Sequence, residues 1–244
     1  NGLEPILQLT CRDRNRIALQ SDLLGAAALG IRNLLILRGD DPRAGDEPQA
    51  KPVFDLDTRD LLHVAAAMRD RGRLLSGTEL QGERPDFFLG AADIPVDPPP
   101  GWQPASLAAK AEAGARFVQT QFCMDAGVVR RYVAALRQAG LTDRLAILIG
   151  LAPLGSVRSA LWIRKHLHGA VIPDAIVARL ARAADPRAEG RAICLELLHE
   201  LSEIPGVAGA HLMPIANASA VPDILAQFRR ETPGRRAARP AEGG

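Results

Sequence analysis

An apolar segment that stops abruptly at charged residues constrains the fold of this chain most. Residues 33–37 read Asn-Leu-Leu-Ile-Leu and are followed directly by Arg38, Gly39 and Asp40. A continuous apolar run is typical of a strand buried in a parallel sheet, and the carboxyl ends of such strands carry the functional residues of α/β proteins. Gly39 would let the backbone come close to a ligand, between two opposite charges. The sequence therefore predicts a site here that suits a polar, planar cofactor.

Strand-like runs and helical patterns alternate along most of the chain, which predicts an α/β fold with a parallel sheet. Six strand–helix units fall short of the eight of a closed barrel, so either the sheet is open or two units precede Asn1. The predicted strands lie near Ile6–Thr10, Asn33–Leu37, Asp86–Ala91, Arg116–Phe122, Leu145–Ile149 and Ala210–Ile215. The predicted helices are Asn15–Leu29, Asp57–Asp70, Pro104–Ala113, Ser156–His168, Pro173–Ala184, Arg187–Glu203, Val221–Arg229 and one between Asp125 and Gly140.

The composition limits the class of protein. With 244 residues, 47% of them hydrophobic, the chain can bury a large core. Its formal net charge of +2 requires no nucleic-acid or membrane-surface partner. Cys11, Cys123 and Cys194 indicate neither a disulfide framework nor a zinc site, which favours a reducing, cytoplasmic setting. No apolar run reaches the length of a membrane span.

The chain is expected to form one incomplete βα-barrel domain over residues 1–229, because no linker interrupts the alternation. Residues 230–244 are rich in arginine, proline and glycine and predict a basic, disordered tail. The segment Asp93–Pro104 contains five prolines and predicts an irregular loop at a strand end, where ligands usually bind.

Polar side chains follow several predicted strands at their carboxyl ends. Because these ends share one rim of a parallel sheet, we expect the side chains to line a common ligand site. A glutamine that points inward offers a donor and an acceptor together, which suits a heterocycle with alternating N–H and C=O groups. The residues concerned are Thr10, Asp13, Arg38, Asp40, Thr120 and Gln121, with Gln8 and Gln119 on the strands before them.

Some of these residues also have a purely structural alternative. Thr120 and Gln121 could satisfy backbone groups at a strand end, and Asp40 could cap a helix. The histidines indicate no metal site, because His166 and His168 do not share a helix face and the others have no nearby Cys or His partner. The sequence contains no phosphate-binding P-loop and no dinucleotide-binding glycine fingerprint.

An ordered series of motifs from Glu4 to Arg229 resembles the methylenetetrahydrofolate reductase family. The order of the motifs makes the resemblance specific, since each motif alone would be weak. The series comprises residues 9–15 (Leu-Thr-Cys-Arg-Asp-Arg-Asn), 29–33, 37–40 (Leu-Arg-Gly-Asp), 51–57, 113–115, 118–122 (Val-Gln-Thr-Gln-Phe), 150–154 and 172–173.

The resemblance implies a (β/α)8 TIM-type barrel, of which this chain holds about six units and lacks the two N-terminal ones. It implies an oxidoreductase that binds FAD and reduces 5,10-methylenetetrahydrofolate to 5-methyltetrahydrofolate, in one-carbon metabolism and methionine biosynthesis. Hydride passes from reduced flavin N5 to the one-carbon unit after the folate ring opens to an iminium cation. The implied partners are the folate substrate, NAD(P)H or an electron-donor protein, and further subunits of a homo-oligomer or hetero-complex.

The resemblance also implies roles for individual residues. Asp40 would be the catalytic residue, near flavin and pterin, where a carboxylate can stabilise the developing cation. Gln121 would bind the pterin by hydrogen bonds, and Asp40 would also contact the substrate. Contacts to FAD would come from Gln8, Thr10, Arg38, Gly39, Asp40, Phe54 and Lys110.

Several positions depart from the family pattern. The family's general acid is a glutamate on the first barrel strand, and nothing in this chain matches it. Ile94 and Pro98 stand where many members have tyrosine and histidine, while Ser159 and Asn217 replace a glutamine and an arginine that hold the folate. Two alternatives follow. The chain could be a flavin- or pterin-binding subunit without turnover of its own, or a different barrel enzyme such as a pterin-binding transferase.

Overall fold

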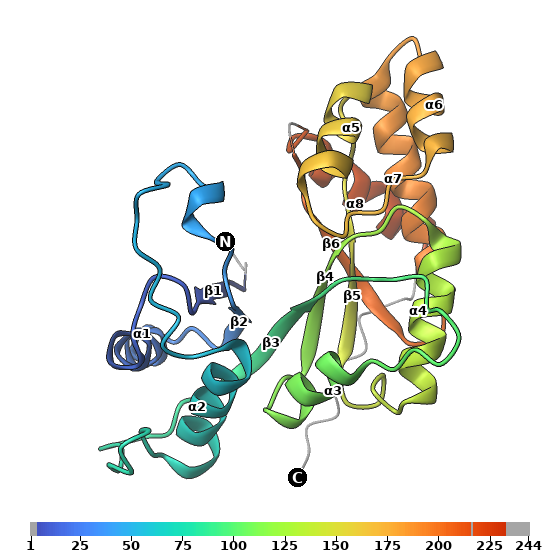
Figure 1. Ribbon diagram of the computed structural model, residues 1–244. Coiled ribbons are helices and arrows are strands. Elements are labelled where there is room, and N and C mark those ends of the chain that lie inside the picture. The colour runs from blue at the N-terminus through green and yellow to red at the C-terminus, as the bar shows by residue number, and fades with distance from the viewer. Residues whose placement is uncertain (1–3, 216, 233–244) are drawn as a thin grey trace. The chain divides into compact units, whose positions relative to one another are not determined.

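The computed structural model describes residues 4–215 and 217–232, in which strands and helices alternate (Figure 1). The strands are β1 (Ile6–Thr10), β2 (Asn33–Leu37), β3 (Phe88–Asp93), β4 (Phe117–Phe122), β5 (Ala146–Leu151) and β6 (Val207–Leu212). The helices are α1 (Arg16–Ala28), α2 (Thr58–Arg71), α3 (Ala105–Glu112), α4 (Ala126–Gln138), α5 (Val157–His166), α6 (Asp174–Arg182), α7 (Pro186–Ser202) and α8 (Ala220–Glu231), with a short 3-10 helix η1 (Pro42–Ala44).

The six described strands form one sheet in the sequential order β1-β2-β3-β4-β5-β6. The pairs β1–β2, β2–β3 and β5–β6 are parallel, with Thr10 opposite Leu37 in the first pair. A doubly wound sheet reverses its strand order partway, whereas a βα barrel does not. The predicted α/β class with barrel-type succession of βα units is therefore confirmed.

The predicted helices and strands agree with the structure to within two residues at each boundary, except for β6, which spans Val207–Leu212 instead of the predicted Ala210–Ile215. Strand β6 begins at Val207, three residues before the predicted start, because residues 207–209 pair with β5 across a register shift near Ile147. The start of β6 was not predicted, because Ala208 and Gly209 are small residues that do not form a recognisable apolar strand pattern. Helix α8 extends to Glu231, so it takes in the first residues of the predicted tail, and residues 233–244 lie outside the described part.

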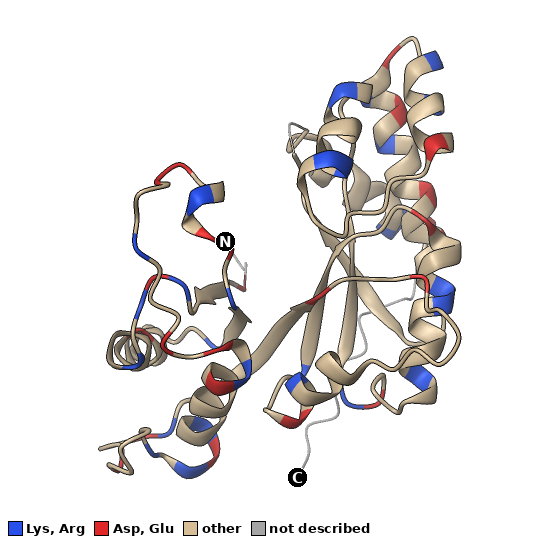
Figure 2. Cartoon of the chain, viewed as in Figure 1, with Lys and Arg blue, Asp and Glu red and all other residues tan. Residues whose placement is uncertain are grey.

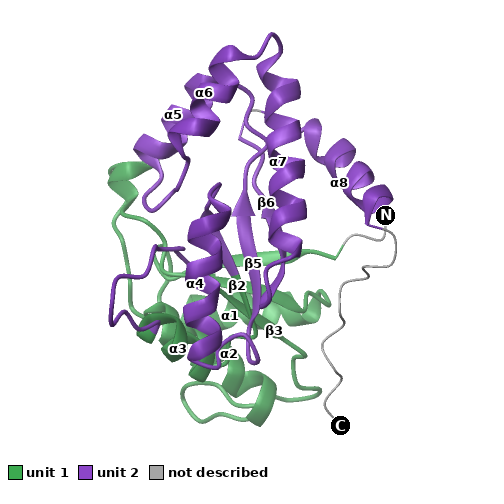
Figure 3. Ribbon diagram, turned by 90° about the vertical axis from the view of Figure 1, so that its right-hand side faces the viewer, with its two compact units in different colours: residues 1–92, 105–118 green, residues 93–104, 119–244 purple. Residues whose placement is uncertain are grey.

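The chain divides into two compact units, which are considered separately (Figure 3). Unit 1 lies within residues 1–92 and 105–118, and unit 2 within 93–104 and 119–244. In unit 1 the core of β2 and α2 is fully buried, and α2 begins with a capping box in which Asp57 and Asp60 bond each other's backbone N–H groups. These contacts fix the strand ends from which the site residues of unit 1 project.

Unit 2 has a core of its own beneath α4 and β5. The core-facing side chains of α4, among them Val129, Tyr132 and Leu136, are fully buried. Helix α7 passes so close to the end of β5 that a Cβ on Gly190 would lie 1.7 Å from the Leu154 carbonyl oxygen. Only glycine permits this close helix–backbone approach.

Candidate functional site

The loops after β1 and β2 lie side by side in unit 1. The Cys11 backbone N–H donates to the Leu37 carbonyl at 3.1 Å, which continues the strand pairing one residue past Thr10. Thr10 Oγ1 donates to Asp13 Oδ2 at 3.1 Å. The predicted residues Thr10, Asp13 and Arg38 are therefore brought to one strand-end region, as parallel pairing requires.

Gly39 allows these two loops to touch. Its φ of 85° lies in the left-handed region, and a Cβ there would come within 2.9 Å of Arg12 Cβ and 3.2 Å of Thr10 Cβ. Any larger residue would face both a strained backbone and a clash with two side chains. The glycine therefore keeps a flat stretch of backbone against the β1 loop.

Arg12 connects the two loops and was not assigned a role from the sequence. Its guanidinium pairs with Asp13, with Nε 2.6 Å from Oδ1, and its Nη1 donates to the Asp40 carbonyl at 3.4 Å. The hydrogen bond from Arg12 lowers the pKa of the Asp13 carboxyl. The signal that could have found Arg12 was its place directly after a strand in the motif Thr-Cys-Arg-Asp.

The Asp40 carboxylate is exposed, and it does not cap a helix. The cap of η1 is Asp41, whose Oδ1 accepts from the Arg43 N–H at 2.9 Å. Hydrogen bonds from the Arg43 side chain and backbone lower the pKa of Asp41 to about 2. The structural alternative for Asp40 is therefore wrong, and its side chain stays available at the strand end.

Arg38 and Phe54 are in contact. The guanidinium carbon of Arg38 lies 4.2 Å from the centre of the Phe54 ring, a cation–π arrangement that fixes the orientation of both groups. Phe54 has a φ of 45°, which a residue with a side chain adopts at a cost of about 1–3 kcal/mol. Contacts with neighbouring residues must therefore stabilise this unfavourable backbone conformation of Phe54.

The neighbours of Phe54 supply that restraint. The Val53 N–H donates to the Arg12 carbonyl at 2.7 Å. Asp55 accepts hydrogen bonds from the Arg16 backbone N–H and from its guanidinium, at 2.8 to 2.9 Å. Residues 53–55 are thus fastened to the β1 loop and to the first turn of α1, which holds the Phe54 ring against Arg38.

The remaining predicted residues of unit 1 flank this cluster. Lys110, in the last turn of α3, donates from Nζ to the Ala92 carbonyl at 2.7 Å, so its ammonium lies at the end of β3. Gln8 is exposed on β1 two residues before Thr10, and side chains two apart on a strand share a face. Unit 1 therefore contains every residue predicted to contact the cofactor.

Thr120 and Gln121 lie in unit 2, where both bond to backbone groups. Thr120 Oγ1 accepts from the Gly150 N–H at 2.9 Å, as the structural alternative predicts. Gln121 Oε1 accepts from the Phe122 N–H at 3.0 Å, and its Nε2 donates to the His168 carbonyl at 3.2 Å. An amide has two N–H donors and two acceptor lone pairs, so Gln121 keeps one of each for a ligand.

The segment after β3 is fixed within unit 2 by residues that the sequence did not single out. The Tyr132 hydroxyl donates to Asp93 Oδ2 at 2.5 Å, and Arg131 forms a two-point ion pair with Asp97 at 2.6 and 2.9 Å. Burial raises the pKa of Tyr132, with a further contribution from the Asp93 charge. Ile94 packs against Gly169, where a Cβ would lie 2.3 Å from Ile94 Cγ2. The predicted irregular loop is therefore held in place by contacts with α4 and with Gly169.

The cysteines and acidic groups give no sign of a metal site. All three cysteines are free and buried, and burial raises the pKa of the Cys11 and Cys123 thiols to about 11 and that of Cys194 to about 12. Within residues 4–215 and 217–232, no group of three His, Cys, Asp or Glu side chains could hold a metal ion. Over the same residues, no helix is long and apolar enough to cross a membrane.

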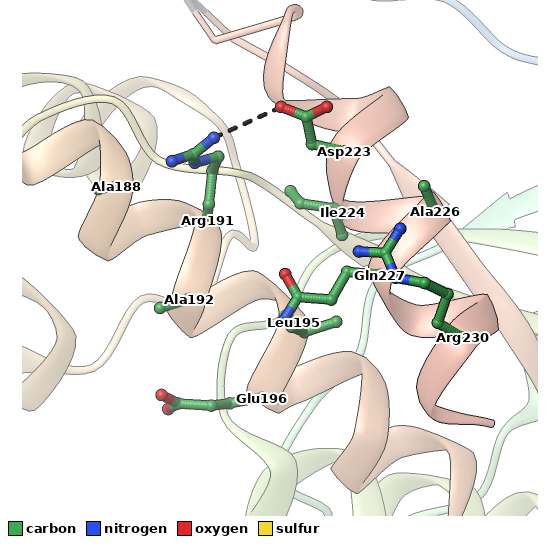
Figure 4. A pocket seen from close by; sticks show the side chains of 10 residues that line it. All are labelled: Ala188, Arg191, Ala192, Leu195, Glu196, Asp223, Ile224, Ala226, Gln227 and Arg230. Atoms are coloured by element: carbon green, nitrogen blue, oxygen red, sulfur yellow. Dashed lines mark hydrogen bonds and ion pairs between the residues drawn. The ribbon is translucent and has the colours of Figure 1, made fainter.

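A separate hollow of about 440 Å³ lies between α7 and α8 (Figure 4). An ion pair of 3.4 Å between Arg191 and Asp223 bridges the two helices there. None of the residues predicted for the site lines this hollow, so it is unrelated to the strand-end cluster of unit 1.

Comparisons with known proteins agree with the order of the motifs. Residues 1–229 match the family model of methylenetetrahydrofolate reductase. A curated relative, the "Probable methylenetetrahydrofolate reductase (NADPH)" of Caenorhabditis elegans, is 27% identical over 232 residues. The match covers 92% of this chain and 32% of the relative, so the chain spans about a third of that protein's length.

Similar solved structures are more distant. They include an uncharacterized Clostridium thermocellum protein that binds two copies of 5-methyl-5,6,7,8-tetrahydrofolic acid (14% identity, 93% of this chain and 94% of that one, TM-score 0.44). DmoA of Hyphomicrobium sulfonivorans (12%, 96% and 69%, TM-score 0.48) and the EDTA monooxygenase EmoA of Chelativorans (13%, 93% and 73%, TM-score 0.48) are further examples. The family model alone covers most of the chain, and the chain belongs to the methylenetetrahydrofolate reductase family.

Proposed function

We propose that this chain forms part of a flavin-dependent reductase that converts 5,10-methylenetetrahydrofolate to 5-methyltetrahydrofolate. Membership of the family supports a folate-related oxidoreductase. The observation that carries the more specific proposal is the cluster at the ends of β1 and β2, where Gly39 lies against Arg12 and Thr10 and the preceding residue, Arg38, stacks its guanidinium on Phe54. Such a surface suits a planar, anionic cofactor.

The residues of unit 1 fit the chemistry of FAD. A dinucleotide cofactor needs cations for its diphosphate and a flat, unobstructed surface for its ring system. Arg38 and Lys110 supply the cations, and Thr10 and Gln8 supply hydrogen-bonding groups on one strand face. Gly39 lets the loop after β2 lie directly against the loop after β1, because a Cβ at this position would come within 2.9 Å of Arg12 Cβ.

When bound, reduced FAD supplies the hydride, and the residues of the chain position and stabilise the folate. The Asp40 carboxylate stabilises positive charge that develops on the one-carbon unit. It is available for this role because Asp41 rather than Asp40 caps η1, while Arg12 steadies the Asp40 backbone. In unit 2, the spare donor and acceptor of Gln121 bind the pterin. NAD(P)H or an electron-donor protein would supply the electrons for the bound flavin.

The test is to purify the full-length polypeptide, record its absorbance spectrum and assay the oxidation of 5-methyltetrahydrofolate with menadione as acceptor. We expect a yellow protein whose flavin is bleached anaerobically by 5-methyltetrahydrofolate, and by NADPH if that is the donor. A colourless protein that takes up no added FAD would overturn the proposal. Flavin binding without any folate oxidation would instead assign a non-catalytic flavin-binding subunit.

A further inference from the structure

The hollow between α7 and α8 is walled by one face of each helix (Figure 4). On α8, Asp223, Gln227 and Arg230 recur at spacings of four and three residues, which places them on the same face. The volume of about 440 Å³ lies within the range of small-molecule sites. The wall that α7 contributes comprises Ala188, Arg191, Ala192, Leu195 and Glu196.

Helix α8 is fastened to α7 on both sides of this hollow. Near the amino end of α8, Asp223 Oδ2 lies 3.4 Å from Arg191 Nη1. At the carboxyl end, Glu231 Oε2 lies 2.7 Å from His199 Nε2. Because the two helices are joined at both points, the space between them is present without a ligand.

Figure 2 shows basic and acidic residues interspersed over the helices of unit 2, but the charges that face the hollow do not balance. Arg191 meets Asp223 in one long contact, with side chains 46% and 71% exposed. Glu196 is already neutralised by Arg179, through contacts of 2.6 and 3.0 Å. Arg230 forms no ion pair with any residue in the described ranges. Two guanidinium groups therefore face one loosely held carboxylate.

The spacing of the two arginines limits what the hollow can hold. Arg191 contacts Asp223, which precedes Arg230 by seven residues, or about 10 Å along the helix axis. A carboxylate paired with a guanidinium lies about 2.8 Å from its nitrogen atoms, so a ligand that reaches both arginines has two carboxylates joined by a short chain. Gln227 lies between these positions on α8. It donates one N–H to Glu231 at 2.9 Å and keeps the other for a ligand.

We infer that the hollow between α7 and α8 is a binding site for a short aliphatic dicarboxylate. One carboxylate pairs with Arg191 in exchange for Asp223, and the other pairs with Arg230. The spare N–H of Gln227 donates to the ligand, whose methylene groups lie over the apolar side chains of the α7 wall. No residue proposed to bind flavin or folate lines the hollow, so this ligand is a different molecule.

The experiment is a calorimetric titration of the full-length polypeptide with glutarate, butyrate and inorganic phosphate at constant ionic strength. Glutarate carries two carboxylates on a three-carbon chain, and butyrate has a similar chain with only one carboxylate. We expect saturable binding of glutarate and about fivefold weaker binding of butyrate, because one exposed ion pair contributes up to about this factor. Phosphate cannot reach both arginines and should bind no better than butyrate.

Three variants test the assignment of the charges. Arg191→Gln/Arg230→Gln should raise the Kd of glutarate by about tenfold or more, since both ion pairs are lost. Asp223→Asn should lower it a few-fold, because Arg191 then has no competing carboxylate, and a gain in affinity does not arise from damage to the fold. The matched control is Arg187→Gln/Arg229→Gln, which removes two exposed cations of the same helices that do not line the hollow and should leave the Kd unchanged.

Several results would overturn the inference. They are no saturable binding of glutarate to the unsubstituted protein, equal affinities for glutarate and phosphate, and an unchanged Kd in the Arg191/Arg230 variant. Loss of binding in a folded Asp223→Asn variant would likewise contradict it, since the carboxylate rather than the cations would then form the site. Circular dichroism checks that each variant is folded. The titrations require neither flavin nor folate, so their outcome is independent of the proposed function.

Discussion

Two adjacent aspartates after β2 have different surroundings. Asp41 caps η1 and forms an ion pair with Arg43. The hydrogen bonds from Arg43 lower the pKa of Asp41 to about 2. Asp40 offers an exposed carboxylate beside Gly39, with its backbone steadied by Arg12. An exposed carboxylate that does not cap a helix is suited to stabilise charge on a ligand rather than the fold.

For this reason we expect Asp40→Asn to impair folate reduction far more than reduction of the flavin. The loss of a charge that acts on the transition state should lower the folate half-reaction by about 100-fold or more. Rapid-reaction kinetics of the two half-reactions measure the difference. Asp41→Asn is the control and should affect neither by more than a few-fold; equal losses in both half-reactions of the Asp40 variant would indicate structural damage or lost flavin.

Ion pairing at Asp55 makes a prediction about acid stability. Hydrogen bonds from Arg16 lower the pKa of Asp55 to about 2, below its value of about 3.9 in an unfolded chain. A depressed folded-state pKa contributes stability that is present above about pH 4 and is lost as the pH falls toward about 2. We expect Arg16→Gln to flatten the pH dependence of the unfolding free energy over this window. Denaturant titrations at several pH values measure it.

The matched control for Arg16→Gln is Arg130→Gln, which removes a longer contact of 3.9 Å to Glu200. It should keep the slope of the unsubstituted protein between pH 2 and 4. If both variants gave the same slope as the unsubstituted protein, the Arg16–Asp55 pair would not fasten residues 53–55 as described.

At the level of helices and strands, close approaches between elements depend on particular glycines. Helix α7 can pass the end of β5 only because Gly190 has no side chain, as a Cβ would meet the Leu154 carbonyl at 1.7 Å. In α1, by contrast, Gly25 has nothing within 4 Å of its Cβ position. Substitution of Gly25 therefore tests helix propensity alone, whereas substitution of Gly190 also tests the packing of α7.

We expect Gly25→Ala to stabilise the protein by about 0.5–1 kcal/mol, because alanine favours the helix and meets no neighbour. Gly190→Ala should instead destabilise it by about 2 kcal/mol or more, since the obstacle is backbone that cannot turn aside. Chemical denaturation of both variants measures the difference. A stabilising Gly190→Ala would show that α7 does not pack against the end of β5 in this way.

The sequence predicted the elements well because buried parallel strands and capped helices leave strong local signals. The apolar run of β2 and the Asp125 cap of α4 gave nearly correct boundaries. The start of β6 was missed because Ala208 and Gly209 carry no such signal, and pairing with β5 decides it. The roles of Arg12 and Tyr132 could not be predicted, because they depend on contacts between residues far apart in the chain that only the fold creates.

Across the whole molecule, the predicted cofactor residues and the predicted substrate residues are distributed differently between the two units. Every residue predicted to contact FAD belongs to this unit, from Gln8 on β1 to Lys110 on α3. The predicted substrate residues are divided, with Asp40 in unit 1 and Gln121 in unit 2. Binding of the cofactor can therefore be tested separately from binding of the folate.

The most direct measurement is the dissociation constant of FAD from the full-length polypeptide carrying Gly39→Ala, compared with Gly30→Ala. Both glycines have a positive φ, of 85° and 72°, so both substitutions strain the backbone. Only at Gly39 would the new Cβ meet Arg12 and Thr10, whereas at Gly30 it would meet nothing within 4 Å. We predict that Gly39→Ala raises the dissociation constant of FAD by at least about tenfold, which corresponds to about 1.4 kcal/mol of binding free energy. Gly30→Ala should leave the dissociation constant unchanged. Equal FAD affinity in the two variants would contradict a flavin site at the ends of β1 and β2.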